Sequence, residues 1–173
     1  RPWRLAPALA ELTQHVWDQG NEHFQPTTFQ VSNLNAGTGA PNVIPGDLKA
    51  RFNLRYSPVQ TQESLRRTVE GILDKHGVRY SIEWYVSGEP FYTPAGALSE
   101  GVCAAVAAVA GSAPRLSTGG GTSDGRFIAT LGSQVVELGV TNASIHKVNE
   151  SVGVAEIEAL HRMYLESLRR LLV

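Results

Sequence analysis

The fold of the first half of the chain is decided by the stretch Leu48-Lys49-Ala50-Arg51-Phe52-Asn53-Leu54-Arg55-Tyr56. Every second side chain in it is apolar, and the side chains in between are basic or amide groups. Because successive side chains of a β-strand point to opposite faces of a sheet, this alternation predicts a strand. We expect that strand to belong to a sheet with one covered face and one polar face.

The segments on either side of this stretch complete a recognisable order of elements. Residues 27–35 predict a second strand, and the alternation at 78–86 predicts a third. Apolar stripes at helical spacing predict helices at 5–16 and 65–73, the latter capped by Thr61 and ended by Gly77. The order helix, strand, strand, helix, strand is that of a split β-α-β-β-α-β unit whose first strand is missing. A missing strand leaves an unpaired edge, so we expect the natural chain to extend upstream of Arg1.

The second half has a different character. Gly88, Pro90 and Pro94 interrupt the chain, and they predict a boundary between domains at 1–87 and 88–173. Beyond the boundary, helices are expected at 95–111 and 126–131, a short buried strand at 134–138, and a long amphipathic helix from Val154. The whole chain is therefore expected to be of the α/β class.

Composition limits the class of protein. The chain has 173 residues, of which 42% are hydrophobic and 18% charged, and its net charge is −1, which predicts a soluble globular protein. It has no basic stripe that favours nucleic acid and no apolar run of the length that spans a membrane. Cys103 is its one cysteine, which excludes a disulfide within the chain and fits a cytoplasmic location.

Two polar, glycine-rich loops are candidate functional sites. Packing alone does not explain why these loops contain the residues that they do. The first, residues 35–46, is either a functional loop or a long hairpin connection with glycines at positive φ. The second, residues 117–127, puts glycines and hydroxyls before a helix, as an anion cradle would, and Arg126 could add a bidentate carboxylate contact. The alternative for this second loop is a capped turn, in which Ser123 or Asp124 caps the helix.

A third loop, residues 141–150, follows the predicted strand at 134–138, and loops at strand ends often carry the sites of open α/β sheets. His146 is its candidate metal ligand or general base, with Asn149 or Glu150 nearby; the alternative is a structural or solvated histidine. A hydrolytic zinc centre needs about three protein ligands for each metal. The chain has no HExxH motif, no His-x-Asp pair and no adjacent carboxylates, so it cannot assemble a complete metal centre.

In all three loops the chain resembles the succinyl-diaminopimelate desuccinylases. The resemblance is co-linear over essentially the whole chain. Any one of the motifs would be weak evidence for the family, but all of them in the same order are specific to it. The segments that carry it are Trp17-Asp18-Gln19-Gly20-Asn21-Glu22, Asn33-Leu34-Asn35-Ala36-Gly37-Thr38-Gly39, Asn42-Val43-Ile44-Pro45-Gly46-Asp47, Thr122-Ser123-Asp124-Gly125-Arg126-Phe127, Glu137-Leu138-Gly139 and Asn142-Ala143-Ser144-Ile145-His146-Lys147-Val148-Asn149-Glu150.

The resemblance implies a two-domain hydrolase of the zinc aminoacylase and carboxypeptidase superfamily. Residues 1–87 would be an incomplete ferredoxin-like lid domain that forms the homodimer, and residues 88–173 the C-terminal part of a zinc-peptidase-like α/β catalytic domain. The implied reaction is metal-assisted hydrolysis of the succinyl amide of N-succinyl-L,L-diaminopimelate, on the route to lysine and diaminopimelate. Two zinc ions would serve the complete enzyme.

Carried over residue by residue, His146 would be a ligand to one zinc, and no catalytic residue lies in this chain. The residues that would bind the dicarboxylate substrate are Arg55, Gly121, Thr122, Ser123, Arg126 and Asn142, and Asn42 would reach a site across the dimer. The other zinc ligands, the glutamate base and a lid histidine would belong to segments upstream of Arg1. Departures from the family pattern at Pro41, Gly119 and Val140 affect loop detail only.

Two alternatives remain open from the sequence. One is a related zinc deacylase, such as acetylornithine deacetylase, which keeps the chemistry and changes the acyl group. The other is a dimerisation and lid fragment that has no activity of its own, which the missing metal ligands favour for the chain as given.

Overall fold

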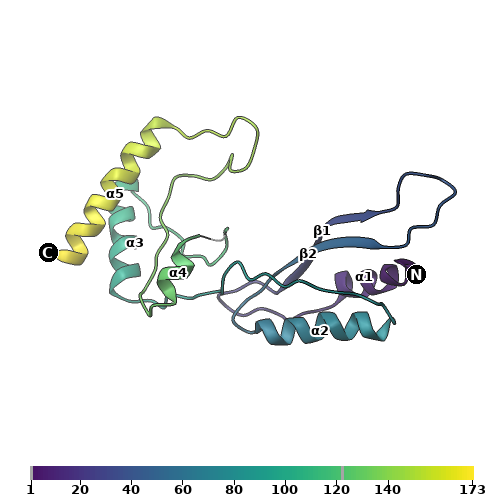
Figure 1. Cartoon of the computed structure of the whole chain (residues 1–173). Helices are drawn as coiled ribbons and strands as arrows, with labels where there is room; N and C mark the ends of the chain where they lie inside the picture. Colours follow the sequence, from purple (N-terminus) through teal and green to yellow (C-terminus); the bar gives the residue numbers. More distant parts are fainter. Residues whose placement is uncertain (1, 122) are drawn as a thin grey trace. The chain divides into compact units, whose positions relative to one another are not determined.

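The computed structural model describes residues 2–121 and 123–173, which form two compact units that divide after Pro90 (Figure 1). Unit 1 ends at Pro90 and unit 2 comprises Phe91–Val173, so the units meet three residues beyond the predicted boundary. In chain order the elements are η1 (Pro2–Arg4), α1 (Leu5–Gln14), β1 (Thr28–Ala36), β2 (Leu48–Arg55), α2 (Gln62–Lys75), α3 (Ala97–Ala110), α4 (Gly125–Ala129) and α5 (Val154–Leu172).

The sheet of unit 1 consists of β1 and β2, which pair antiparallel from Thr28 opposite Arg55 to Ala36 opposite Leu48. The register shifts once, between Val31 and Asn33. Exposure alternates without a break along β2, with every basic or amide side chain of the strand on the exposed side. The predicted strand with one covered and one polar face is therefore confirmed.

The core of unit 1 lies between the two helices and the covered face of the sheet. Its buried side chains come from α1, the connection after it, β1 and α2; they are Ala8, Leu12, Trp17, Phe29, Leu65, Val69, Ile72 and Leu73. Stacked rings continue this core across the sheet, with centroids 5.9 Å apart for Trp17 and Phe29 and 5.1 Å apart for Phe29 and Phe52. Burial of a side chain such as Leu12 contributes roughly 1.5–3 kcal/mol to folding.

Helix α2 begins and ends where the sequence predicts. Thr61 caps it: its Oγ1 accepts from the Ser64 N–H at 3.1 Å, while its own N–H donates to Ser64 Oγ at 3.0 Å. Gly77 follows the last turn with φ +60°. At this end Lys75 and His76 both reach Glu11 of α1, at 2.8 and 2.7 Å, and so join the two helices.

The segment between α1 and β1 is a turn held by side-chain oxygens. Asp18 Oδ1 accepts from the N–H groups of Gly20 and Thr27, at 2.8 and 3.0 Å. Gly20 has φ +66°, and a Cβ on it would lie 2.4 Å from the Phe24 carbonyl oxygen. The motif at residues 17–22 is thus explained by this turn, because its aspartate and glycine are the residues that close it.

Two predicted strands are wrong. Residues 78–86 and 134–138 are not strands, because neither segment has a neighbouring strand in the described parts of the chain. Of the side chains that the alternation predicted to face inward, Val78, Ile82 and Trp84 pack against the core of unit 1, whereas Tyr80 and Val86 are each 40% exposed. In the second segment, Val135 exchanges hydrogen bonds with the Thr93 hydroxyl, at 2.7 and 3.0 Å, in place of a strand partner.

Unit 2 is built on the packing of α3 against α5. The helices approach closely at Gly101, where a Cβ would lie 2.9 Å from Leu171 Cδ2. Much of the apolar stripe of α5 remains uncovered, since Ile157 is 51% and Leu172 76% exposed. Among the described residues, no helix combines the length and apolar character needed to cross a membrane.

We predict that Gly20→Ala destabilises unit 1 by roughly 2 kcal/mol or more, because it combines a left-handed backbone with a clash against Phe24. Urea unfolding followed by tryptophan fluorescence measures this. Gly39→Ala is the matched control: Gly39 has φ +85° but no atom within 4 Å of the added Cβ, so it reports the backbone cost alone. Equal losses for the two variants would contradict the steric part of this explanation.

A second prediction concerns acid stability. Burial acts to raise the pKa of the Asp18 carboxyl, but hydrogen bonds from Thr27 and Gly20 outweigh it and hold the pKa below its ordinary value of 3.8. A lowered folded-state pKa adds stability that is present above pH 3.8 and lost as the pH falls further. Asp18→Asn should therefore flatten the fall of Tm in this acidic range, measured by circular dichroism. Asp47→Asn, at an exposed carboxylate, should leave the wild-type curve unchanged.

Candidate functional site

The predicted site residues lie in both units. Asn42 and Arg55 belong to unit 1, and the others belong to unit 2: Gly121, Ser123, Arg126, Asn142 and His146. Thr122, which the resemblance implies as a substrate contact, lies outside the described residues. The chain thus offers two groups of candidate residues, one in each unit.

Arg55 is the last residue of β2 and lies opposite Thr28 on the polar face of the sheet. Its side chain is exposed and forms no hydrogen bond or ion pair with any described residue. A guanidinium held on a rigid strand without a carboxylate partner is available for an anion from outside the unit.

Asn42 lies in the loop between β1 and β2, at the far end of the sheet from Arg55. The loop turns with Gly37 and Gly39 at φ +79° and +85°, which confirms the expected hairpin connection with glycines at positive φ. Its two limbs enclose a hollow of about 270 Å³. The length of β2, at about 3.3 Å per residue, puts Asn42 and Arg55 more than about 20 Å apart. One small substrate therefore cannot touch both residues of the same unit.

In the glycine-rich loop of unit 2, Ser123 is the capping residue. Its Oγ accepts from the Gly125 N–H at 3.1 Å, whereas Asp124 makes no capping bond. Helix α4 has five residues, so its dipole is small. Of the two interpretations of this loop, the structure agrees with the capped turn, and any anion bound here depends on side chains.

Arg126 is the side chain best arranged for that purpose. Its Nη1 donates to the Ser123 carbonyl at 2.7 Å, and its guanidinium carbon lies 4.3 Å from the centre of the Phe127 ring. Only 20% of the side chain is exposed, and its nearest carboxylate oxygen, on Asp124, is 4.0 Å away. Its Nε is buried without a hydrogen-bond partner among the described residues. An oriented guanidinium with an unused buried donor is suited to bind a carboxylate.

Glu137 is part of this arrangement, although no sequence pattern assigned it a role. The Ser123 hydroxyl donates to its carboxylate, and a Cβ on Gly125 would lie 3.0 Å from Glu137 Oε1. Glu137 therefore holds the loop that carries Arg126, and Gly125 is needed for the close approach. The sequence signal for Glu137 was the Glu137-Leu138-Gly139 motif, which includes this residue but does not indicate that it contacts Ser123.

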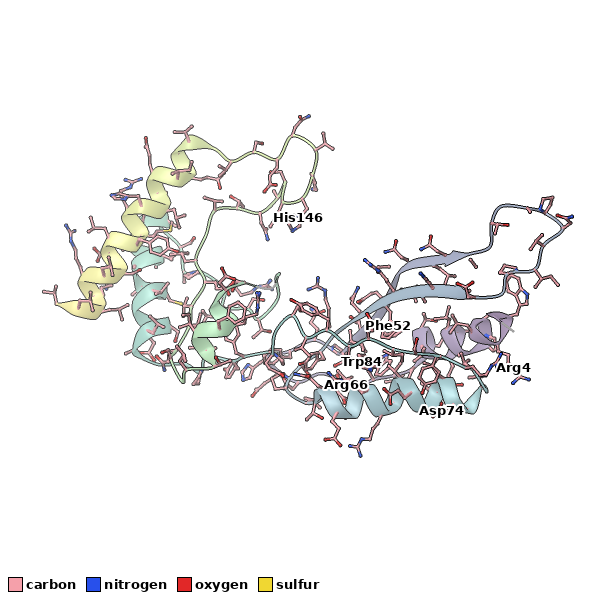
Figure 2. All side chains as sticks on the ribbon, viewed as in Figure 1. Arg4, Phe52, Arg66, Asp74, Trp84 and His146 are labelled. Atoms are coloured by element: carbon pink, nitrogen blue, oxygen red, sulfur yellow. The ribbon has the colours of Figure 1, made fainter. Side chains whose placement is uncertain are left out.

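His146 and Asn142 lie in one loop before α5, in which the Ile145 N–H donates to the Asn142 carbonyl at 3.1 Å (Figure 2). Ser144 closes the loop by hydrogen bonds to the backbone of Ser151, at 2.7 and 3.0 Å. His146 has φ +61°, an uncommon conformation for a residue other than glycine. Its exposed imidazole makes no hydrogen bond to a described residue, so both ring nitrogens are available to a ligand.

By their ligand chemistry, the described residues do not complete a metal centre. No group of three histidine, cysteine, aspartate or glutamate side chains that could hold a metal ion occurs within residues 2–121 and 123–173. A hydrolytic zinc ion takes about three protein ligands. The described residues therefore do not fit a whole metal site.

Part of the chain matches a known protein domain, and nearly all of it is similar to known proteins. Residues 3–81 match the peptidase dimerisation domain. The chain is 56% identical over 170 residues to a succinyl-diaminopimelate desuccinylase of Thioalkalivibrio sulfidiphilus, covering 98% of this chain and 45% of that protein. It is 57% identical over 169 residues to the protein of that name from Methylococcus capsulatus, with coverages of 98% and 45%. The chain thus spans less than half the length of these relatives.

A solved structure shares the fold. It is an M20 family metallo-carboxypeptidase, Sso-CP2, from Sulfolobus solfataricus, with a TM-score of 0.67 over 86% of this chain and 36% of that one, at 18% identity. The fold and the sequence matches lead to one conclusion: this chain is similar, along nearly its whole length, to a portion of proteins named succinyl-diaminopimelate desuccinylase, and its residues 3–81 match the peptidase dimerisation domain.

Proposed function

We propose that the chain is part of a zinc-dependent amidohydrolase that hydrolyses N-succinyl-L,L-diaminopimelate to succinate and L,L-diaminopimelate. The observation that carries the proposal is the identity of 54–57% to relatives of that name over at least 96% of this chain. Zinc, as two ions in the complete enzyme, is part of the proposal. The described residues do not complete a metal site, so the roles that we propose for this chain are those of its own side chains.

The proposed role of this chain is to select and hold the substrate. Arg126 binds one carboxylate, because its guanidinium is oriented and has an unused donor. Gly121, Thr122, Ser123 and Asn142 add backbone, hydroxyl and amide groups around it, and His146 is the one metal ligand from this chain. Because Arg126 is mostly buried, a charge-assisted hydrogen bond from its guanidinium is stronger than it would be in water, which favours a carboxylate over a neutral acyl group.

The proposal for unit 1 is a lid that also forms a homodimer, with residues 1–87 as the lid domain and 88–173 as part of the catalytic domain. Arg55 presents a second cation to the carboxylates of the substrate. Asn42 serves the site of the partner subunit, which fits its distance from Arg55 within one unit. The enzyme is proposed to be cytoplasmic, with no nucleic-acid or membrane partner.

Two other functions compete with this proposal. A related zinc deacylase, such as acetylornithine deacetylase, would have less use for Arg55 and Arg126 as carboxylate-binding groups, because an acetyl group carries no carboxylate. A dimerisation fragment without activity is favoured by one observation, the lack of a three-ligand metal group among the described residues. This second function and the main proposal agree if activity belongs to the longer protein alone.

We predict that Arg55→Ala, made in a protein extended to the length of its relatives, raises KM for the succinyl substrate by roughly 10- to 100-fold with little change in kcat. The reason is the loss of a charge-assisted hydrogen bond that is present in both the ground state and the transition state. Arg51→Ala is the matched control, on the same exposed face of β2 and four residues away. Equal effects of the two substitutions would mean that β2 contributes only a general positive field.

We also predict that the 173-residue chain alone hydrolyses neither the succinyl nor the acetyl substrate, with or without added zinc. Sedimentation and zinc analysis of one sample provide the check: a mass of twice 18.7 kDa is expected, with far less than one zinc ion per chain. Zinc-dependent turnover by the chain itself would contradict the assignment of the remaining ligands to the longer protein.

A further inference from the structure

The loop that carries His146 has no apolar core to hold its shape (Figure 2). Every residue of 141–150 except Ser144 is exposed, and the apolar side chains of Ile145 and Val148 are 47% and 93% exposed. Yet His146 adopts φ +61°, a conformation that a residue with a side chain leaves unless its surroundings fix it. Since burial does not fix this backbone, the hydrogen bonds of the loop must do so.

Two consecutive turns make up the loop. The Lys147 N–H donates to the Ser144 carbonyl at 3.0 Å, and the Glu150 N–H donates to the Lys147 carbonyl at 3.1 Å. Each turn has a residue with φ +61° at its third position, His146 in the first turn and Asn149 in the second. A positive φ at the third position is typical of a type II turn, in which glycine or asparagine is preferred there. Asn149 therefore suits its turn, whereas His146 needs support from the rest of the loop.

Ser144 closes both turns with one side chain. Its Oγ donates to the Ser151 carbonyl at 2.7 Å and accepts from the Ser151 N–H at 3.0 Å. This pair of hydrogen bonds, the serine clamp, joins the first residue of the first turn to the residue that follows the second turn. The start of the loop is tied separately, because the N–H and the hydroxyl of Thr141 both donate to Glu156 of α5. The span 144–151 is thus a ring that one hydroxyl closes.

We propose that Ser144 is the positioning residue of His146: the serine clamp holds the left-handed backbone of His146 and so fixes the direction in which the imidazole is presented. The Cα–Cβ bond turns with φ, so release of the clamp would let the backbone return to the negative φ that histidine prefers and would turn the ring away. Threonine at position 144 would keep the hydroxyl that makes the clamp, whereas alanine would lose both of its hydrogen bonds.

This inference rests on the proposed function for one point, the use of the imidazole as a ligand. Removal of a group that orients a ligand histidine commonly lowers activity or affinity by about 10- to 100-fold. The control of the His146 backbone by Ser144 is a separate claim about the loop itself. It can be measured in the 173-residue chain without metal or substrate.

The first experiment is nuclear magnetic resonance of the 173-residue chain and its variants. Cross-relaxation between the amide proton and the Hα of one residue is stronger at positive φ than at negative φ, so it reports the backbone of His146. Ser144→Ala should weaken this signal and should speed exchange of the Ser151 N–H by about 10-fold or more. Ser144→Thr should change neither quantity.

Ser151→Ala is the matched control, because the Ser151 hydroxyl makes no hydrogen bond to a described residue while its backbone carries the clamp. This variant should keep the wild-type signal of His146. An unchanged His146 signal in Ser144→Ala overturns the proposal, since the turns would then hold their φ without the hydroxyl. An equal loss in Ser151→Ala also overturns it, because that variant keeps the clamp.

Ser144→Ala should leave Tm unchanged, because the loop contributes no buried side chain to the core. If Tm does fall, Ser144→Cys takes its place in the same measurement. Cysteine is close to serine in size and is a much weaker hydrogen-bond donor and acceptor, so it removes the clamp with little change in volume.

The second experiment tests the use of the loop, in a protein extended to the length of its relatives. Ser144→Ala should lower kcat by about 10-fold or more with little change in KM, and Ser144→Thr should restore it. Rescue by the hydroxyl at an unchanged Tm separates positioning from a loss of folded protein. If Ser144→Ala moves His146 in the chain but leaves kcat unchanged, the positioning by Ser144 stands and the ligand role proposed for His146 is wrong.

Discussion

The contact between Phe29 and Phe52 is the interaction on which the rest of unit 1 depends. The two rings, 5.1 Å apart, join the start of β1 to the middle of β2 on the covered face of the sheet. Trp17 extends the stack toward α1, and Trp84 extends it toward α2 through Glu70. Aromatic pairs of this kind add about 0.5–1.5 kcal/mol each beyond the area they bury. A unit with only two strands among its described residues needs such a bridge, because a lone hairpin is marginal in water.

The same strand that builds the core also presents the cations. Along β2 the apolar side chains face the helices, so the period of two leaves Lys49, Arg51 and Arg55 on the open face. Opposite these residues β1 offers Asn35, Asn33 and Thr28, none of which carries a charge. The cations of β2 are therefore not neutralised by their own sheet. An anion that met this face would find positive charge held on a strand whose position is fixed by the core.

Periodicity alone predicted β1, β2 and the helices of unit 1, because each of these elements buries a face that the sequence displays. It failed at 78–86 and 134–138 for one physical reason. Alternation reports which side chains are covered, whereas a strand exists only when another backbone completes its hydrogen bonds. The contact of Ser123 with Glu137 was out of reach for a similar reason, since it joins residues fourteen apart in sequence through a side chain. His146 was singled out by residue type, but no local pattern predicted its φ of +61°.

Unit 2 contains two local features that cost folding free energy, one at Arg126 and one at His146. A buried guanidinium Nε without a partner among the described residues costs roughly 1–3 kcal/mol, and a histidine in the left-handed region adds about 1 kcal/mol or more. A carboxylate at Arg126 would satisfy the first cost, and a ligand on the imidazole would use the orientation that the second imposes. Both costs lie in the segments 123–127 and 141–150 of unit 2, and neither lies in its long helices α3 and α5, which is the distribution expected if those segments were selected for binding and the long helices for stability.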